Sequence, residues 1–333
     1  MDPKLRIEEM GRRIDRLHRS VLEPDVLSGL LPVRARTLGH RSAQPDARAR
    51  ERRLREASAS YARAVDDSQA RAEQTRVIDL QGLRWWVPLL RPDDEAHVER
   101  YLTHQDFPYR AITQTRDVGI GGAMIDIGAN IGRMCIPRVI LGDVQVAYCA
   151  EPDPLNYACL VRNARDNSMA GLVLPDQLAI GSQDGTVRLE RAKSAGGHKV
   201  IDPAARSKRE TVEVPALTLD TWVDRVGIDL QQLSFVKVDA QGSEVHVLRG
   251  AGRVLACRHV AWQIEIDPPL LSARGCQAED LFALLRPHFT HFIDLNRRAA
   301  GPRVRAIRDI AEALAYVIGP TDGRTDVLVF TVA

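Results

Sequence analysis

The stretch that decides the fold runs from Met124 to Gly132 and reads MIDIGANIG. An apolar strand leads directly into a loop of small residues, and a helix is expected to begin near residue 131. In a doubly wound sheet, such a turn lies at the carboxyl end of a central strand, where ligands bind. Small residues let a ligand approach the backbone, and the first turn of the helix offers free N–H groups. The stretch therefore predicts a ligand-binding loop.

A second apolar strand ends at Glu151, nineteen residues after Gly132. An acid at this position can accept hydrogen bonds from both hydroxyls of a ribose. A dinucleotide-binding loop would need a second glycine two positions after Gly128, but Asn130 stands there. Asp126, just before the loop, is typical of sites for a cationic nucleoside without phosphate, such as S-adenosylmethionine. A tight turn that binds no ligand is the alternative.

Strands and helices alternate along most of the chain, which predicts parallel crossover units and a sheet covered by helices on both faces. Before them, VIDLQGLRWWVPLL from Val77 predicts a hairpin around Gln81-Gly82, and a helix is expected from Pro92 to Thr103. The expected strands are 123–127, 145–150, 172–174, 177–181, 186–190, 211–215, 234–238, 259–266, 289–294 and 326–332. The expected helices are 131–141, 154–167, 219–226, 243–255, 277–286 and 308–316.

Residues 1–76 differ in composition from the rest, with 17 Lys and Arg against 12 Asp and Glu. They are predicted to form a helical, Arg-rich extension, and residues 77–333 to form the main α/β domain. Five apolar residues in the extension recur at alternating spacings of three and four, namely Ile7, Met10, Ile14, Leu17 and Val21. This seam predicts a helix that either packs on its own domain or forms a homo-oligomer through residues 5–22.

The 333-residue chain carries a formal net charge of +2, which gives no general case for nucleic acid as a partner. No apolar stretch approaches the roughly 18 residues of a membrane-spanning helix, and the N-terminal residues lack the apolar core of a signal peptide. The five cysteines show no CxxC spacing, which argues against a disulfide framework or a Cys-rich zinc site. These features predict a cytoplasmic protein.

Six successive motifs resemble those of the FkbM-type S-adenosylmethionine-dependent methyltransferase family. They are DIGANIG, AEPDPLNYACLVRNARDN, LAIGSQDG, LTLDTWV, FVKVDAQGSEVHVLRGA and WQIEID, between residues 126 and 267. The resemblance implies a Rossmann-like class I methyltransferase fold with a mostly parallel seven-stranded sheet. It also implies S-adenosylmethionine as the donor and, usually, O-methylation. The implied acceptors are sugars of surface polysaccharides or glycolipids, or polyketide-type metabolites.

The resemblance also implies site residues by position. Those implied to bind the donor are Asp126, Gly128, Asn130, Gly132, Glu151, Asp153, Asp176 and Gln177. Asp239 ends a core strand and would face the transferred methyl group. The family usually has an acid where this chain has Gln241, and an amide cannot act as a base or as a strong ligand for a hard metal. We therefore expect no metal in this site.

Methyl transfer from a sulfonium requires the acceptor oxygen to be aligned with the methyl carbon, and it requires a group that takes the hydroxyl proton. The candidates for this group are Asp239, His198 in a glycine-containing loop, and Glu265 at the end of the next strand. One alternative is a nicotinamide-dependent Rossmann oxidoreductase, which the absent second glycine disfavours. The other is a non-catalytic methyltransferase-like scaffold, to which Gln241 gives some weight.

Overall fold

The computed structural model describes residues 74–80, 82–91, 93–102, 119, 121–202, 206–296, 304–318 and 323–332. The helices predicted for the N-terminal extension, including the apolar seam from Ile7 to Val21, lie outside the described residues. Within the described residues, no helix combines the length and the apolar character that crossing a membrane would require.

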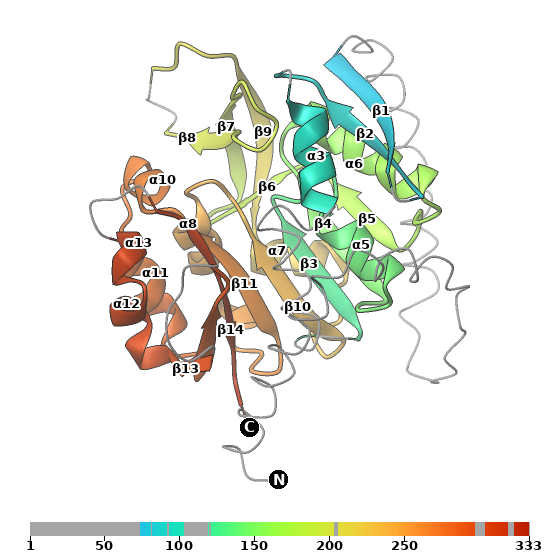
Figure 1. Ribbon diagram of the computed structural model, residues 1–333. Coiled ribbons are helices and arrows are strands. Elements are labelled where there is room, and N and C mark those ends of the chain that lie inside the picture. Colours follow the sequence, from blue (N-terminus) through green and yellow to red (C-terminus); the bar gives the residue numbers. More distant parts are fainter. Residues whose placement is uncertain are drawn as a thin grey trace.

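An eight-stranded sheet runs through the molecule in the order β13-β12-β14-β11-β10-β3-β4-β5 (Figure 1). Its strands are β3 (Ala123–Ile127), β4 (Val146–Ala150), β5 (Val173–Asp176), β10 (Leu233–Val238), β11 (Ala261–Ile266), β12 (His291–Asp294), β13 (Val304–Ala306) and β14 (Thr325–Phe330). Neighbouring strands from β5 to β11 pair in parallel, whereas β14 is antiparallel to both β11 and β12. The predicted fold class is confirmed, but the sheet has eight strands instead of seven because β13 adds an edge strand to β12.

Successive side chains of the central strands enter two separate apolar cores. Met124 and Phe235 belong to one core, whereas their neighbours Ile125 and Val236 belong to the other. Both faces of the sheet are therefore buried, since side chains alternate along a strand. The first core is covered by α3 (Asp94–Leu102), α5 (Cys135–Ile140) and α6 (Pro154–Asp166). The second is covered by α7 (Leu219–Val226), α8 (Glu244–Arg249), α9 (Gly252–Leu255), α11 (Ala278–Leu285) and α12 (Ile310–Ala313).

Most predicted helix boundaries agree with the structure to within a few residues, but the helix expected over 243–255 is divided into α8 and α9. The division falls at Gly250, whose carbonyl accepts a hydrogen bond from the N–H of Asp220 at 3.1 Å. This carbonyl thus has a partner outside the helix. One further short helix was not predicted, α10 (Pro268–Ala273), and the helix expected over 308–316 is divided into α12 and α13 (Ala315–Ile318).

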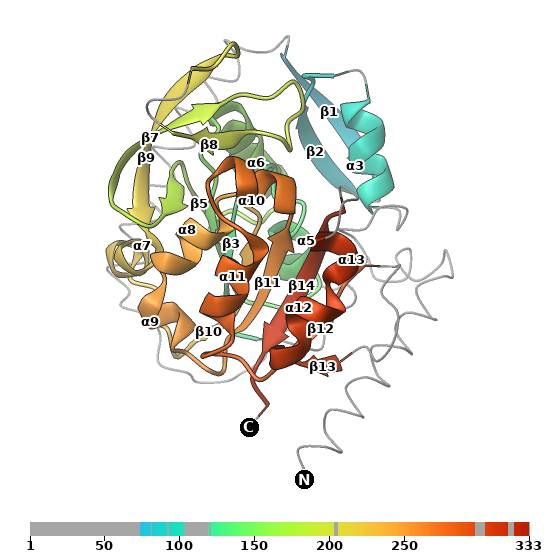
Figure 2. The same ribbon diagram turned by 90° about the vertical axis from the view of Figure 1, so that its left-hand side faces the viewer.

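A second sheet of four strands, in the order β6-β9-β7-β8, stands at one end of the large sheet (Figures 1 and 2). Its strands are β6 (Ala179–Gly181), β7 (Gly185–Glu190), β8 (Lys199–Ile201) and β9 (Thr211–Thr218). Leu189, Val214 and Ala216 form a small core of its own. Three of these strands were predicted from the sequence, but their separation from the large sheet was not.

The predicted hairpin is present as β1 (Thr75–Leu80) and β2 (Leu83–Pro88). The N–H of Trp86 donates to the side-chain oxygen of Asn163 at 2.6 Å, and its indole donates to Asp166 at 2.8 Å. These contacts fix the hairpin to α6. The hairpin with α3 and the small sheet lie at the same end of the large sheet (Figures 1 and 2).

Candidate active site

A cavity of about 310 Å³ opens where the carboxyl ends of β3, β4, β10 and β11 meet the small sheet and the hairpin. This volume is within the range of small-molecule sites, and the position is the one that ligands take in open α/β sheets. The predicted residues that line it are Asp126, Gly128, Asn130, Glu151, His198, Asp239 and Glu265. We name its two ends by their predicted roles. The donor end comprises residues 128–130 and Glu151, and the acceptor end comprises Lys237, Asp239, Gln241 and Glu265.

The backbone at Gly128 determines how closely two loops approach at the floor of the cavity. Its φ is +74°, and a Cβ at this position would collide with the carbonyl oxygen of Asp239. Only glycine meets both conditions without strain. The absence of a side chain at Gly128 therefore allows the loop after β3 to lie against the turn after β10.

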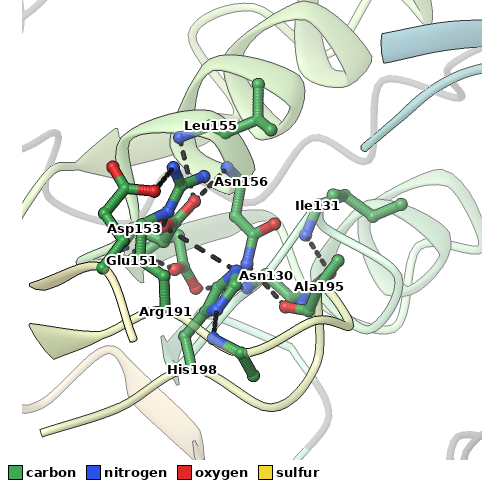
Figure 3. Close-up of polar contacts among 11 residues, drawn as sticks. Asn130, Ile131, Glu151, Asp153, Leu155, Asn156, Arg191, Ala195 and His198 are labelled. Atoms are coloured by element: carbon green, nitrogen blue, oxygen red, sulfur yellow. Dashed lines mark hydrogen bonds and ion pairs between the residues drawn. The ribbon is translucent and has the colours of Figure 1, made fainter. Parts of the chain in front are cut away.

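Asn130 connects three segments at the donor end (Figure 3). Its N–H donates to Glu151 Oε2 at 2.8 Å, and its side-chain amide donates to the carbonyl of Ala195 at 2.8 Å. Its side-chain oxygen accepts from the N–H of Ile131 at 2.8 Å. With φ at +54°, the residue is in the left-handed region that asparagine tolerates better than most. Asn130 thus fixes the loop, the end of β4 and the 194–198 segment together.

Glu151 is buried, with 4% of its surface exposed, and main-chain groups hold its carboxylate. Oε1 accepts from the N–H of Asp153 at 2.9 Å, and Oε2 accepts from Asn130. Burial, and next the charge of Asp153, raise the pKa of Glu151 to about 8. Each carboxylate oxygen has two lone pairs, so both can accept a further hydrogen bond from a ligand in the cavity.

Four residues predicted to bind the donor do not line the cavity: Gly132, Asp153, Asp176 and Gln177. Asp153 is fully buried and caps α6, since its Oδ1 accepts from the N–H groups of Leu155 and Asn156. Its Oδ2 lies 2.8 Å from Nε of Arg191 (Figure 3). The prediction for Asp153 is corrected because both oxygens serve structure.

The other three predicted residues lie outside the cavity for local structural reasons. A Cβ at Gly132, where φ is +91°, would press against Ile136 and Leu160, so this glycine allows helix packing. Asp176 ends β5 and accepts a hydrogen bond from the indole of Trp222 at 2.8 Å. The chain reaches the cavity two residues later, through the segment 178–180. The cavity is therefore lined just after the two predicted residues, Asp176 and Gln177.

His198 lines the donor end, but both ring nitrogens face groups of the protein (Figure 3). The N–H of Ala192 donates to Nδ1 at 2.9 Å, and Nε2 lies 3.7 Å from Asp153 Oδ2. Burial lowers the pKa of His198. Because Nδ1 accepts the hydrogen bond from Ala192, the neutral form of the ring carries its proton on Nε2, and its only lone pair is already engaged. The carbonyl of Ala195 also accepts from Asn130 and Asn156, so this segment is fixed to the donor end.

Asp239 and Glu265 do come together, at the acceptor end. Lys237 Nζ lies 3.1 Å from Asp239 Oδ2, and the Gln241 amide donates to Asp239 Oδ1 at 2.8 Å and to Glu265 Oε2 at 3.0 Å. Burial alone would raise the pKa of Asp239, but Lys237 and Gln241 bring it below its ordinary value. Burial and the charge of Asp239 raise the pKa of Glu265 well above its ordinary value. Lys237 and Gln241 thus favour the charged form of Asp239, and burial next to Asp239 favours the protonated form of Glu265.

At the cavity floor, two buried polar residues that were not predicted, Lys237 and Gln263, continue a row that begins with the predicted Asp126. Asp126, Lys237 and Gln263 stand opposite one another in β3, β10 and β11. Each of the three lies two residues after an apolar core residue, on the same face of the sheet. A polar residue at an otherwise buried position of a strand is the sequence signal that could have identified Lys237 and Gln263. Gln263 donates to Asp326 on β14 at 2.5 Å, and burial raises the pKa of Asp326 to about 6.

Three basic residues on one side of the cavity, in α3 or just before α3 and α5, were also not predicted. They are Arg91, His97 and Arg133, which line the cavity beside the hairpin. Burial, and next the charges of Arg133 and Arg91, lower the pKa of His97 to about 4. Burial is thus the main cause of the low pKa, and the two arginines add to it.

Asp126 is fully buried, and neither carboxylate oxygen has a hydrogen-bond partner among the described residues. Burial raises its pKa. With Cys135 and Cys149, it forms the one group of three potential metal ligands found in the described part of the chain. Burial also raises the pKa of both thiols, which disfavours the thiolates that metals bind. Asp126 therefore stays a predicted donor-binding residue at the cavity floor.

The sequence model of the methyltransferase FkbM domain matches residues 126–303, more than half of the chain. A search among curated proteins found no match. Similar solved structures include a methyltransferase FkbM from Methylobacillus flagellatus, with a TM-score of 0.40 and 17% identity over 63% of this chain and 44% of that chain. They also include the tRNA methyltransferase TrmK from B. subtilis, with a TM-score of 0.38 and 9% identity over 67% of this chain and 65% of that chain.

A third similar structure is TYW2 from M. jannaschii in complex with AdoMet, with a TM-score of 0.34 and 10% identity over 77% of this chain and 85% of that chain. The chain therefore spans less than two thirds of the first two structures. The family match begins at Asp126, on the strand that carries the donor loop, and extends past Glu265. The chain belongs to the FkbM methyltransferase domain family, whose methyl donor is S-adenosylmethionine.

Proposed function

We propose that the protein transfers the methyl group of S-adenosylmethionine to a hydroxyl oxygen. The acceptor is a sugar of a surface polysaccharide or glycolipid, or a polyketide-type metabolite, and the reaction takes place in the cytoplasm. The observation that carries the proposal is the partly exposed carboxylate of Asp239 at the acceptor end, 3.1 Å from Nζ of Lys237. A third of the Asp239 side chain (34%) is exposed, so a hydroxyl group can reach it.

The donor end offers a partner for each polar part of the donor. Glu151 would accept hydrogen bonds from the two ribose hydroxyls, and Asp126, on the cavity floor, would accept from the ammonium group. Segment 178–180 would line the adenine. The donor brings a methyl group already activated on a sulfonium. The protein therefore has mainly to align the acceptor and to take its proton.

Asp239 is placed for that second task. Lys237 and Gln241 keep its carboxylate charged, so it can accept a hydrogen bond from the acceptor hydroxyl and orient the oxygen. As the new C–O bond forms, the hydroxyl becomes strongly acidic and its proton passes to Asp239. An ordinary carboxylate suffices for this late transfer, although it is a weak base toward a free hydroxyl.

The test compares glycans and small metabolites from a strain that lacks the gene with those from the same strain expressing wild-type protein or Asp239→Asn. We expect the deletion to remove one methyl ether from a defined hydroxyl, and wild-type protein to restore it. Mass spectrometry with linkage analysis locates the methyl group. If the lost methyl sits on nitrogen or carbon, or if no methylated compound changes, the proposed O-methylation is wrong.

A further inference from the structure

Gln241 lies in the turn between β10 and α8, and its backbone is in the left-handed region, which glutamine rarely adopts. Its φ is +49°, which is uncommon for a residue other than glycine, asparagine or aspartate. The carboxylate of Glu244 accepts from the N–H groups on either side, those of Ala240 at 2.8 Å and Gly242 at 3.2 Å. The turn is thus held by Glu244, and the side chain of Gln241 is left to reach the cavity.

The amide of Gln241 lies between two carboxyl groups that come from different strands. Its Nε2 is 2.8 Å from Oδ1 of Asp239 and 3.0 Å from Oε2 of Glu265. An amide NH₂ group carries two protons, so it can donate to both oxygens at once. A glutamate at this position would have no proton to donate when ionised, and it would add a third negative group.

Building on the proposed function, we propose that Gln241 is the positioning residue that holds Asp239 and Glu265 as a carboxyl pair with one proton, which resides on Glu265. The charge of the pair then stays on Asp239, the member that faces the acceptor hydroxyl. The amide at this position therefore lets two carboxyl groups act together in the site.

Bonds, protons and charges all balance when methyl transfer uses Asp239 as the proton acceptor. The acceptor oxygen forms a bond to the methyl carbon, and the bond between that carbon and the donor sulfur breaks, its electron pair remaining on sulfur. The hydroxyl proton moves to the carboxylate of Asp239, so one positive charge on the donor and one negative charge on Asp239 disappear together. The carboxylic acid then returns its proton to water when the product leaves.

Several other charged groups face the pair, and each bears on its titration. Lys237 on β10 contacts Asp239, and Arg324, just before β14, lies 3.9 Å from Glu265 Oε1. Asp326 on β14 and Glu244 on α8 both raise the pKa of Glu265 by their charges. Asp239 in turn raises the pKa of Asp126 on β3. A change at Gln241 alone leaves all five of these groups in place: Lys237, Arg324, Asp326, Glu244 and Asp126.

The experiment is a ¹³C NMR pH titration of the side-chain carboxyl carbons in the full-length protein, with Asp239→Asn and Glu265→Gln used to assign the two signals. The test variants are Gln241→Asn and Gln241→Glu. The first keeps an amide and suits a positive φ, but it is one methylene too short to bridge. The second keeps the length but lacks the NH₂ group. Gln241→Gly removes the side chain at a φ that glycine tolerates, so a folded variant is available.

In the wild type we expect Asp239 to titrate below, and Glu265 well above, their ordinary pKa values. In all three Gln241 variants the pKa of Asp239 should rise by about one unit, because the bridging hydrogen bond is lost. The affinity for S-adenosylhomocysteine and the melting temperature should change little, which separates positioning from a structural role. The acidic limb of the pH–rate profile should shift upward with the pKa of Asp239.

If the pKa of Asp239 is the same in wild type and all three variants, Gln241 does not position the pair and the inference is wrong. An inverted order in the wild type, with the proton on Asp239, would also overturn it. The titration needs no acceptor and no turnover. A failure of the proposed function would appear instead as an unaltered methylation pattern in the deletion strain, with the titration unaffected.

Discussion

The two ends of the cavity are built in different ways. At the donor end, main-chain groups do most of the work, since the positive φ of Gly128 and the N–H groups of Asn130 and Asp153 fix the site around Glu151. At the acceptor end, side chains hold one another, through the contacts of Gln241 with Asp239 and Glu265. A short sequence motif can specify the first kind of site, whereas the second needs strands far apart in the chain.

The largest loss of stability and of donor binding should come from Gly128→Val, because this substitution disturbs both ends of the cavity at once. A side chain at this φ collides with the carbonyl oxygen of Asp239, so it displaces both the donor loop and the turn after β10. We expect a loss of about 3 kcal/mol in the free energy of unfolding and no measurable donor binding. Urea denaturation and titration calorimetry measure the two quantities.

Gly142→Val is the matched control for this variant. Gly142 has a similar φ of +73°, but a Cβ there would meet nothing within 4 Å. It should show the cost of the backbone strain alone and bind the donor normally. Normal donor binding by Gly128→Val would show that the close approach of the two loops is unimportant.

Glu151→Gln should affect the donor end alone. The variant keeps the shape, but it loses the charge and turns an NH₂ group toward one of the two main-chain N–H donors. We expect an affinity for S-adenosylhomocysteine lower by about 2 kcal/mol, or about thirtyfold in Kd, at pH 9. Calorimetry measures the affinity, with the exposed Glu210→Gln as the control. An unchanged Kd would remove Glu151 from the site.

The raised pKa of Glu151 predicts that donor affinity depends on pH. The ribose hydroxyls bind the ionised form, whereas the free protein holds the protonated form below about pH 8. Binding at pH 7 must therefore release a proton, and affinity should be about tenfold weaker there than at pH 9. The probe is 5′-methylthioadenosine, which has the ribose but no ammonium or carboxylate group. Glu151→Gln should show no such dependence, and a flat profile in the wild type would contradict the assignment.

A smaller effect is expected at His198. Asn at this position places an oxygen where Nδ1 accepts from the N–H of Ala192, so His198→Asn should keep the rate of methyl transfer within about threefold. His198→Ala leaves that N–H without its partner and should cost about 1–2 kcal/mol of stability. Thermal unfolding and a methylation assay compare the two variants. A loss of rate in both, with stability retained, would restore His198 as a base.

The sequence predicted the proximity of the loop after β3 and Glu151 better than the contacts among the side chains of the acceptor end, for a physical reason. The loop 126–132 and Glu151 lie at the ends of consecutive strands, so their proximity follows from the parallel crossover alone. The acceptor end depends on the register between β10 and β11 and between β11 and β14, which places Lys237 beside Gln263 and Glu265 beside Asp326. No local pattern in the sequence encodes that register.

The surroundings of Asp153 and His198 differ from those predicted, and the two differences share a cause. Asp153 stands in a motif next to Glu151, but a residue before a proline at the start of a helix is a favourable N-cap, and capping uses its oxygens. His198 was read as lying in a flexible loop, whereas the two asparagine amides that bind Ala195 fix that segment. The sequence identified residues capable of hydrogen bonding, but it did not show which protein groups their side chains would contact.

The central claim is that donor binding and proton transfer belong to different ends of one cavity. The most direct measurement compares Asp239→Asn with wild type in both respects: calorimetry with S-adenosylhomocysteine, and transfer of a labelled methyl group to extract from the deletion strain. The account predicts a Kd within about threefold of wild type and a rate at least tenfold lower, about 1.4 kcal/mol in the transition state. A wild-type rate, or a loss of donor affinity as large as that of Glu151→Gln, would contradict it.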